Sequence, residues 1–263
     1  MRPKKALIIY IEFASQPKEH QKTVRVVKET LKEHGCDYRF IPRNRFNKRR
    51  MRGADIIITV GGDGTFLSVA QQNVKGVPML GVNSNPQTKV GFLCNADRFD
   101  FKKKFERISK NRFRLVKLTR LECKIGQKVL EPALNEIFFG HSKPYKLSRY
   151  TLYINKKSEK QRSSGIIVGT ATGSNAWLRS AGAKPMRRDA TRMQLFVREP
   201  HKGPFMRSTM VKTLLRPNDV IRIKSREKNQ IVIADSVGVE YKARYGEWIT
   251  IRRSPHPLPV IFF

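Results

Sequence analysis

A run of β-branched residues that ends in a glycine-rich turn is the feature that most constrains how this chain folds. Residues 55–60 read Asp-Ile-Ile-Ile-Thr-Val, which is typical of a parallel strand covered on both faces. Gly61-Gly-Asp-Gly-Thr65 follows directly, and residues 66–72 have the character of a helix. The surrounding segments alternate in the same way, with strands expected at 6–11, 37–41 and 78–82 and a helix at 18–34. The first third of the chain is therefore predicted to be an α/β domain with a Rossmann-like parallel sheet.

The pattern changes near residue 113 to short alternating apolar runs separated by turn residues, which predicts a β-rich, sandwich-like second domain. We place the α/β domain at 1–98 and the β-rich domain at 99–252, beginning with a connecting helix. Residues 253–263 are expected to form a tail that packs on the body of the protein.

Composition excludes several classes of protein. The 54 Lys and Arg residues exceed the 21 Asp and Glu residues by 33, yet 39% hydrophobic residues are enough for a packed core. No apolar run approaches the roughly 18–20 residues of a membrane span, and the basic opening does not read as a signal peptide. The three cysteines are far apart and the five histidines form no ligand cluster, so we expect a reducing, cytoplasmic location and no protein-held metal.

The glycine-rich turn predicts a phosphate site. Backbone N–H groups and the helix dipole at such a turn bind phosphate oxygens, and Gly62 and Gly64 permit close approach. Asp63 would repel phosphate unless it accepts a proton or acts through Mg²⁺, which indicates phosphoryl transfer. An ordinary tight turn in which Asp63 caps the helix is the alternative for this motif by itself.

Two further segments add specificity. Leu134-Asn-Glu-Ile137 places an amide beside a carboxylate, and Gly169-Thr-Ala-Thr-Gly-Ser-Asn-Ala-Trp177 is a second turn rich in small residues. With the first turn, and in this order, they resemble the motifs of the NAD kinase family over most of the chain. The resemblance implies an N-terminal α/β domain, a β-sandwich-like C-terminal domain and a nucleotide site between them.

The resemblance also implies roles for individual residues. Asp63 corresponds to the general base that accepts the proton of the adenosine 2′-hydroxyl, and Asn135 with Glu136 corresponds to the pair that binds the adenosine. Asp235 would lie near the donor phosphates or their Mg²⁺, although a carboxylate in a strand-end turn is the alternative. The remaining expected nucleotide contacts are Gly62, Gly64, Thr65, Lys146, Arg162, Ser164, Thr172, Gly173, Ser174, Asn175, Ala176, Trp177 and Ser180.

Some positions depart from the family pattern. Ser164 stands where many bacterial members have Asp, and Trp177 where they have Tyr. A solvated lysine is the alternative for Lys146, whose alignment depends on a variable loop. These departures look more like the branch with plant NADH kinase and mitochondrial NAD kinase, so NADH joins NAD⁺ as an expected acceptor.

The resemblance implies ATP or polyphosphate as phosphoryl donor, Mg²⁺ carried by that donor, and a homodimer or homotetramer. A lipid kinase of the diacylglycerol or sphingosine type shares the first turn, but those enzymes carry Gly-Thr-x-Asn-Asp where this chain reads Gly81-Val-Asn-Ser-Asn85. A second alternative is a non-catalytic protein that binds polyanions. Basic runs such as 43–52 allow nonspecific contact with nucleic acid, but they lack regular aromatic residues, and we interpret them as solvated faces.

Overall fold

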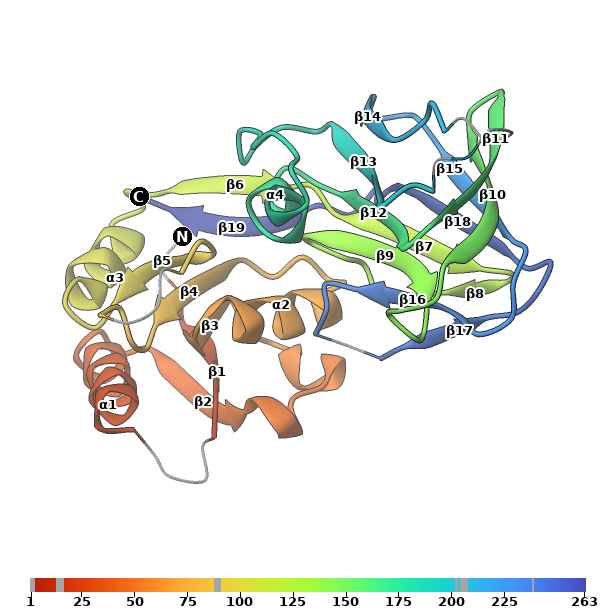
Figure 1. Ribbon diagram of the computed structural model, residues 1–263. Helices are drawn as coiled ribbons and strands as arrows, with labels where there is room; N and C mark the ends of the chain where they lie inside the picture. Colours follow the sequence, from red (N-terminus) through yellow and green to blue (C-terminus); the bar gives the residue numbers. More distant parts are fainter. Residues whose placement is uncertain (1–2, 13–16, 88–90, 202, 204–207, 238) are drawn as a thin grey trace. The chain divides into compact units, whose positions relative to one another are not determined.

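The computed structural model describes residues 3–12, 17–87, 91–201, 203, 208–237 and 239–263. It divides into two compact units (Figure 1). The first comprises Met1–Lys117 with Leu258–Phe263, and the second comprises Leu118–Pro257. The expected combination of an α/β domain and a β-rich domain is confirmed.

A sheet with a parallel core, in the order β2-β1-β3-β4-β19-β6 with β5 also on β4, forms the centre of the first unit. Its strands are β1 (Lys5–Tyr10), β2 (Asp37–Pro42), β3 (Ile56–Gly61), β4 (Met79–Asn83), β5 (Cys94–Asp97), β6 (Arg114–Leu118) and β19 (Leu258–Phe262). The helices are α1 (Lys18–Glu33), α2 (Asp63–Gln72) and α3 (Phe101–Ser109), with 3₁₀ turns η1 (Arg43–Arg45) and η2 (Lys48–Met51).

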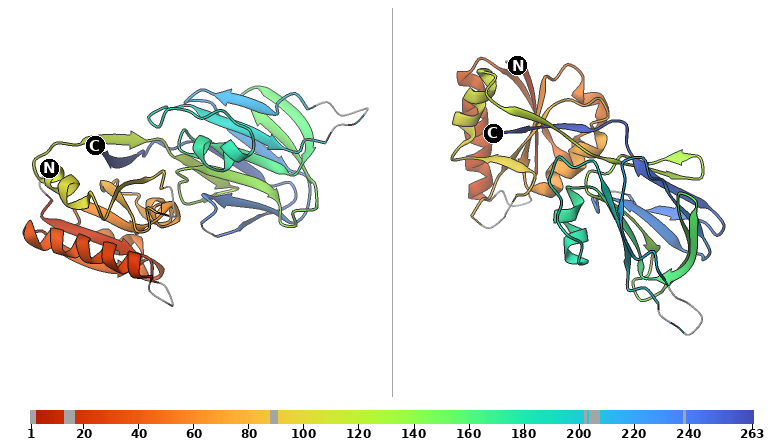
Figure 2. Two further views of the ribbon diagram at one scale, coloured as in Figure 1. Left: turned by 60° about the vertical axis from the view of Figure 1, so that its left-hand side comes forward. Right: turned by 90° about the horizontal axis from the view of Figure 1, so that it is seen from above.

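Helices cover both faces of this sheet (Figure 2). One face packs Val27 of α1 and Phe105 of α3 against Ile8 and Ile58 in a shared apolar core. Because both faces are covered, every residue of β3 is buried, as its β-branched run predicts.

The α3 helix and the C-terminal strand both belong to the first unit. The sequence placed α3 at the start of the second domain, but Phe101, Phe105 and Ile108 lie in the core that α1 and the parallel sheet form. The C-terminal segment, expected to be a tail, is strand β19, and Val260 pairs in parallel with Met79 of β4. The compact units therefore change at 117/118 and again at 257/258.

The second unit consists mainly of two stacked antiparallel sheets. One has the order β11-β10-β15-β18-β7-β8 and the other β14-β13-β12-β9-β16-β17. Its strands are β7 (Leu121–Ile125), β8 (Lys128–Val129), β9 (Glu136–His141), β10 (Ser148–Ile154), β11 (Lys157–Ser163), β12 (Gly165–Gly169), β13 (Met193–Arg198), β14 (Lys212–Leu215), β15 (Ile221–Ser225), β16 (Gln230–Ala234), β17 (Tyr241–Ala243) and β18 (Trp248–Arg253). The 3₁₀ turn η3 (Gly173–Asn175) and the short helix α4 (Trp177–Ser180) follow β12.

Alternation along the strands builds the core between these sheets. Leu152 and Ile223 from one sheet pack with Phe139 and Ile166 from the other, and all four are fully buried. The opposite face of the second sheet carries a smaller apolar cluster, in which Leu178 of α4 packs with Phe138 and Ile167. Successive side chains of β9 and β12 therefore point to opposite faces of the sheet and pack into two different apolar layers.

Candidate active site

One group of candidate residues lies in the first unit, at the carboxyl end of β3. Gly61 ends the strand and Gly62 is the N-cap of α2, so Asp63 is the first residue of the helix. A Cβ atom on Gly61 would lie 2.4 Å from Oγ1 of Thr65, which explains why glycine is needed there. Among the described residues, a Cβ on Gly62 or Gly64 would have no neighbour within 4 Å, so the turn leaves space for a ligand. The N–H of Thr65 donates to the Gly62 carbonyl (3.0 Å), and the N–H groups of Asp63 and Gly64 precede it at the start of α2.

The carboxylate of Asp63 has a fixed orientation. Its Oδ2 accepts a hydrogen bond from the backbone N–H of Phe92 (2.9 Å), and its Oδ1 accepts one from Leu93 (2.8 Å). Burial and the neighbouring Asp63 charge raise the pKa of the Cys94 thiol to about 12. Each carboxylate oxygen accepts two hydrogen bonds comfortably, so both keep capacity for a ligand. These two contacts with the 92–93 backbone were not predictable from the sequence, because they join segments 29 and 30 residues apart.

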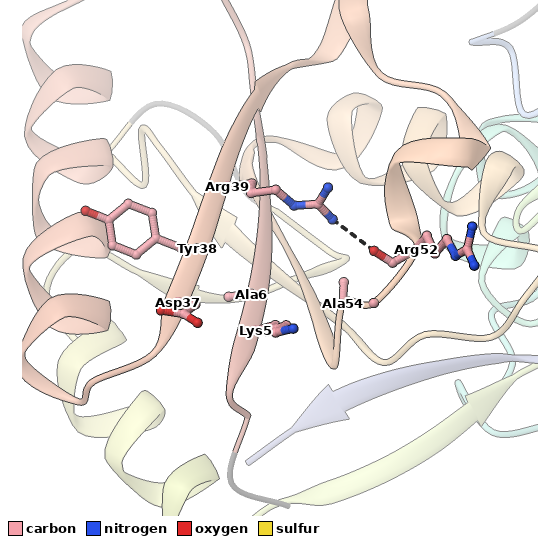
Figure 3. A pocket seen from close by; sticks show the side chains of 8 residues that line it. Lys5, Ala6, Asp37, Tyr38, Arg39, Arg52 and Ala54 are labelled. Carbon is pink, nitrogen blue, oxygen red and sulfur yellow. Dashed lines mark hydrogen bonds between the residues drawn. The ribbon is translucent and has the colours of Figure 1, made fainter.

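The amino ends of the same strands carry a separate cavity of about 340 Å³ (Figure 3). It is lined by Lys5, Ala6, Asp37, Tyr38, Arg39, Arg52, Gly53 and Ala54. The guanidinium of Arg39 donates to the backbone carbonyls of Arg50 (3.0 Å) and Arg52 (3.1 Å). Ligands of parallel α/β sheets bind at the carboxyl ends of the strands, so this cavity does not belong to the candidate site.

Another group of candidate residues lies in the second unit, in a turn held by Asp235. Asp235 is 2% exposed and adopts φ 56° after β16. Its carboxylate accepts backbone N–H groups from Leu134 (2.8 Å), Asn135 (2.6 Å) and Glu136 (3.2 Å). Asp235 therefore acts as the strand-end carboxylate that the sequence analysis gave as the alternative, with its hydrogen bonds directed to protein backbone.

Asn135 and Glu136 each carry a buried oxygen without a protein partner. These atoms are Oδ1 of Asn135 and Oε2 of Glu136, and within the described part of the chain neither has a hydrogen bond. Leaving a buried polar atom unpaired costs about 1–3 kcal/mol, so these two oxygens are candidates for ligand contact. Burial, reinforced by the negative charge of Asp235, raises the pKa of Glu136 to about 8.

Of the two neighbouring carboxyls, Glu136 is the one that retains its proton near neutral pH. Burial raises the pKa of Asp235 to about 7, but three backbone N–H groups and the nearby Arg120 stabilise its charged form. Oε2 of Glu136 has no such donor within the described residues. A protonated Glu136 presents both a hydrogen-bond donor and an acceptor.

The glycine-rich turn after β12 packs directly on this pair. The Thr170 hydroxyl donates to the Leu134 carbonyl (2.6 Å), and the Thr170 N–H donates to the Asn135 carbonyl (2.9 Å). A Cβ on Gly173 would lie 2.1 Å from the Asn135 carbonyl oxygen, so only glycine allows this approach. The hydroxyl of Ser174 donates to the Ala171 carbonyl and accepts from the Met186 N–H. Thr172 and Ser174 are buried and serve the turn itself.

Trp177 and Arg198 extend the site along the outer face of the second sheet. The ring of Trp177 lies 5.1 Å from that of Phe138, and the Arg198 guanidinium lies 5.5 Å from the Trp177 ring centre. The register pairs Gly169 with Glu136 and Ile167 with Phe138, which puts Glu136 on the same face as Phe138. Sequence reasoning gave Arg198 no role, because its position beside Trp177 depends on the pairing of β13 with β12.

Other predicted residues occupy different places. Lys146 is exposed in the turn that follows the carboxyl end of β9, whereas Glu136 begins that strand. Arg162 pairs with Arg149 on the sheet of β10 and β11, on the face opposite to Ser163. Ser164 donates its N–H to the Arg198 carbonyl at the start of β12, and Ser180 is exposed at the end of α4.

The described residues contain no group of three or more His, Cys, Asp or Glu side chains that could hold a metal ion. The same residues contain no helix long and apolar enough to cross a membrane.

Comparison with known proteins gives a consistent result. Residues 5–113 match the model of the ATP-NAD kinase N-terminal domain, and residues 134–263 match that of the ATP-NAD kinase C-terminal domain. A probable NADH kinase of Oryza sativa subsp. japonica is 25% identical over 264 residues, covering 92% of this chain and 81% of the relative. The mitochondrial NAD kinase 2 of Rattus norvegicus is 27% identical over 202 residues, covering 60% of this chain and 48% of the relative.

Among solved structures, an NAD kinase from Archaeoglobus fulgidus in complex with ATP superposes with a TM-score of 0.78 at 25% identity. The match covers 98% of this chain and 93% of that one.

Proposed function

The chain belongs to the ATP-NAD kinase family, and we propose that it transfers the γ-phosphoryl group of ATP to the adenosine 2′-hydroxyl of NAD⁺ or NADH. The observation that carries this proposal is the placement of Asp63 as the first residue of α2, between two glycines whose Cβ positions are open. One short segment thereby supplies both a carboxylate base and backbone donors for phosphate.

Asp63 has the geometry of a general base. The 92–93 backbone orients its carboxylate, which leaves acceptor capacity for the proton of a ribose hydroxyl. As the hydroxyl oxygen attacks the γ-phosphorus, its proton passes to Asp63, the new O–P bond forms, and the bond from that phosphorus to the bridging oxygen of ADP breaks. The N–H groups of Asp63 and Gly64 at the start of α2 donate to phosphate oxygens, and the glycines beside them allow close approach.

Asn135 and Glu136 bind the adenosine in this proposal. Their unpartnered oxygens are held in place by Asp235 through backbone N–H groups. A protonated Glu136 both donates and accepts a hydrogen bond, and so matches the adenine edge or ribose hydroxyls. Trp177 and Arg198 add an aromatic surface and a positive charge on the same sheet face.

The donor is ATP, with polyphosphate as the alternative, and Mg²⁺ arrives bound to its phosphates. Mg²⁺ neutralises charge that develops on the donor oxygens. The match to an NAD kinase in complex with ATP supports this donor, and the similarity to a plant protein named NADH kinase supports NADH beside NAD⁺ as acceptor. A homodimer or homotetramer, and a cytoplasmic location, stay predictions.

The decisive experiment compares NADP(H) formation by wild type and Asp63→Asn, with NAD⁺ and NADH as acceptors and with ATP or polyphosphate as donor. Loss of a general base is expected to lower kcat by about a hundredfold or more.

Asp55→Asn is the matched control. Oδ2 of Asp55 also accepts two backbone N–H groups, from Lys4 (2.8 Å) and Lys5 (2.9 Å), but it lies at the amino end of β3. If both variants lose activity equally, the effect of Asp63→Asn is structural and the general-base role is wrong. Phosphorylation of diacylglycerol or sphingosine vesicles without NADP(H) formation would favour the lipid kinase instead.

A further inference from the structure

The outer face of the β11-β10-β15-β18-β7 sheet combines cations with aromatic side chains. Directly opposed residues of antiparallel strands share one face of a sheet. The register aligns Tyr153 with Arg222, Arg222 with Thr250, and Thr250 with Lys124. A second row aligns Lys160 with Thr151, Thr151 with Lys224, and Lys224 with Trp248. These residues and their neighbours on the same side of the sheet are called the basic sheet face. Its members are Lys124, Arg149, Thr151, Tyr153, Lys160, Arg162, Arg222, Lys224, Trp248, Thr250 and Arg252.

This face points away from the core. Leu152, Ile223 and Ile249 alternate with its members along the strands and are fully buried between the sheets. Arg222 is exposed and Trp248 is 37% exposed. The cations and rings of the basic sheet face are therefore available at the surface.

The aromatic residues form a compact group with two of the cations. The rings of Tyr153 and Trp248 lie 5.2 Å apart between centres. The Arg222 guanidinium lies 5.6 Å from the Trp248 ring and 6.0 Å from the Tyr153 ring, and Lys224 Nζ lies 5.4 Å from Trp248. Aromatic rings interleaved with Arg and Lys are the surface that stacks unpaired bases and binds their phosphates.

Few carboxylates neutralise this face. Glu122 pairs with Arg252 (2.7 Å), and Glu227 pairs with Arg149 (3.1 Å). Lys124, Lys160, Arg162, Arg222 and Lys224 make no ion pair with any carboxylate in the described parts of the chain. A second copy of this chain would bring like charges together across a two-fold axis, so charge complementarity favours a polyanion.

We propose that the basic sheet face binds single-stranded nucleic acid, with phosphates at Lys124, Arg222 and Lys224 and bases stacked on Trp248 and Tyr153. This function is additional to the proposed kinase activity and does not depend on it. The residues of this face lie outside the basic runs that the sequence singles out, such as 43–52. Tyr153 and Trp248 are distant along the chain, and strand pairing brings them together.

The test measures binding of fluorescein-labelled (dT)12, U12 and a 12-base-pair duplex to the full chain by fluorescence anisotropy at several salt concentrations. The variant Lys124→Gln/Arg222→Gln/Lys224→Gln should weaken single-strand binding by about tenfold or more. It should also reduce the slope of log K against log salt by about 2, because each phosphate contact contributes roughly 0.7. The matched control Lys48→Gln/Arg49→Gln/Lys103→Gln removes three exposed cations of the first unit and should change affinity less than about twofold.

Variants of Trp248 distinguish the contribution of base stacking from that of charge. Trp248→Ala should weaken single-strand binding about tenfold with the salt slope unchanged, and Trp248→Phe should restore most of it. Melting curves and circular dichroism confirm that the variants are folded.

Three results would each overturn the proposal. The first is equal weakening by the control triple, which would mean diffuse surface charge, and the second is equal affinity for the duplex. The third is a change from oligomer to monomer, seen by light scattering, in the Lys124→Gln/Arg222→Gln/Lys224→Gln variant with nucleic acid binding unchanged. That result would mean that a second copy of the chain covers the face.

Discussion

The carboxylate of Asp235 lies 2.6 Å from the backbone nitrogen of Asn135, a residue 100 positions earlier in the chain. The same carboxylate accepts the N–H groups of Leu134 and Glu136. The loop that presents Asn135 and Glu136 is thus held by a side chain at the end of another strand. Asp235 is a positioning residue for the adenosine contacts proposed above.

Asp235→Asn is expected to destabilise the protein and to weaken nucleotide binding. The substitution turns one acceptor oxygen into an amide donor facing buried N–H groups, at a cost of roughly 2–4 kcal/mol. Urea unfolding measures the stability loss, and KM for NAD⁺ should rise more than kcat falls. Asp219→Asn is the control, because Asp219 accepts from Arg216 N–H near the surface and should cost less than about 1 kcal/mol. Equal costs for the two variants would contradict the positioning role.

Stability should fall as pH rises between about 4.5 and 8, and Glu136 should account for one proton of this dependence. Burial raises its pKa to about 8 from the ordinary value of 4.5, so the folded state keeps a proton that the unfolded state has lost. The stabilisation is fully present below about 4.5 and is lost by about pH 8, with a slope of at most ~1.4 kcal/mol per pH unit. In Glu136→Gln, the free energy of unfolding measured in urea from pH 5 to 8 should fall less steeply with pH, by up to that slope. An unchanged slope in the variant would show that Glu136 ionises normally.

Gly64→Ala should separate function from stability. A Cβ at this position has no neighbour within 4 Å among the described residues, and alanine favours a helix over glycine by up to about 1 kcal/mol. The melting temperature should therefore stay equal or rise. Catalytic efficiency should fall by about tenfold or more, because the methyl group occupies the space through which phosphate approaches the start of α2. Full activity in a stable variant would argue against a phosphate site there.

Gly173→Ala should lower the stability of the protein, which Gly64→Ala should not. Its Cβ would lie 2.1 Å from the Asn135 carbonyl oxygen and 2.6 Å from the carbonyl carbon. Backbone has to move, so we expect a stability loss of about 1–3 kcal/mol together with weaker nucleotide binding. Calorimetry of wild type, Gly173→Ala and Gly64→Ala under one condition checks the contrast. A melting temperature equal to wild type for Gly173→Ala would show that the turn packs less closely on Asn135.

The three cysteines should resist thiol reagents in the native protein. Burial raises the pKa of Cys36 to about 11 and that of Cys94 to about 12, and it raises the pKa of Cys123 further. At pH 8 the reactive thiolate is then roughly a thousandth of each thiol or less. Labelling with a chromogenic disulfide should be at least about a hundredfold slower than in urea, where all three react. Rapid reaction of one cysteine in native protein would locate a site of local opening.

Much of the fold was predictable because its signals are local. The β3 run of β-branched residues, the glycines that end it and the helix that follows lie within 17 consecutive residues. The alternating runs of the second unit likewise revealed strands such as β10 and β16. Strand β11, with the sequence KSEKQRS, was missed because its outward residues are charged and its inward ones, Gln161 and Ser163, are polar partners of Tyr150.

The sequence by itself determined the two-domain composition, the strand-turn-helix around Asp63, and the three motifs that identify the family, because each depends on residues adjacent in the chain. Tertiary structure alone decided that Asp235 holds Asn135, that β19 returns to pair with β4, and that Trp248 meets Tyr153 on a basic face. These relationships depend on which strands pair and in which register. Register is set by burial of the whole sheet and by closure of long loops, which no local pattern of residues specifies.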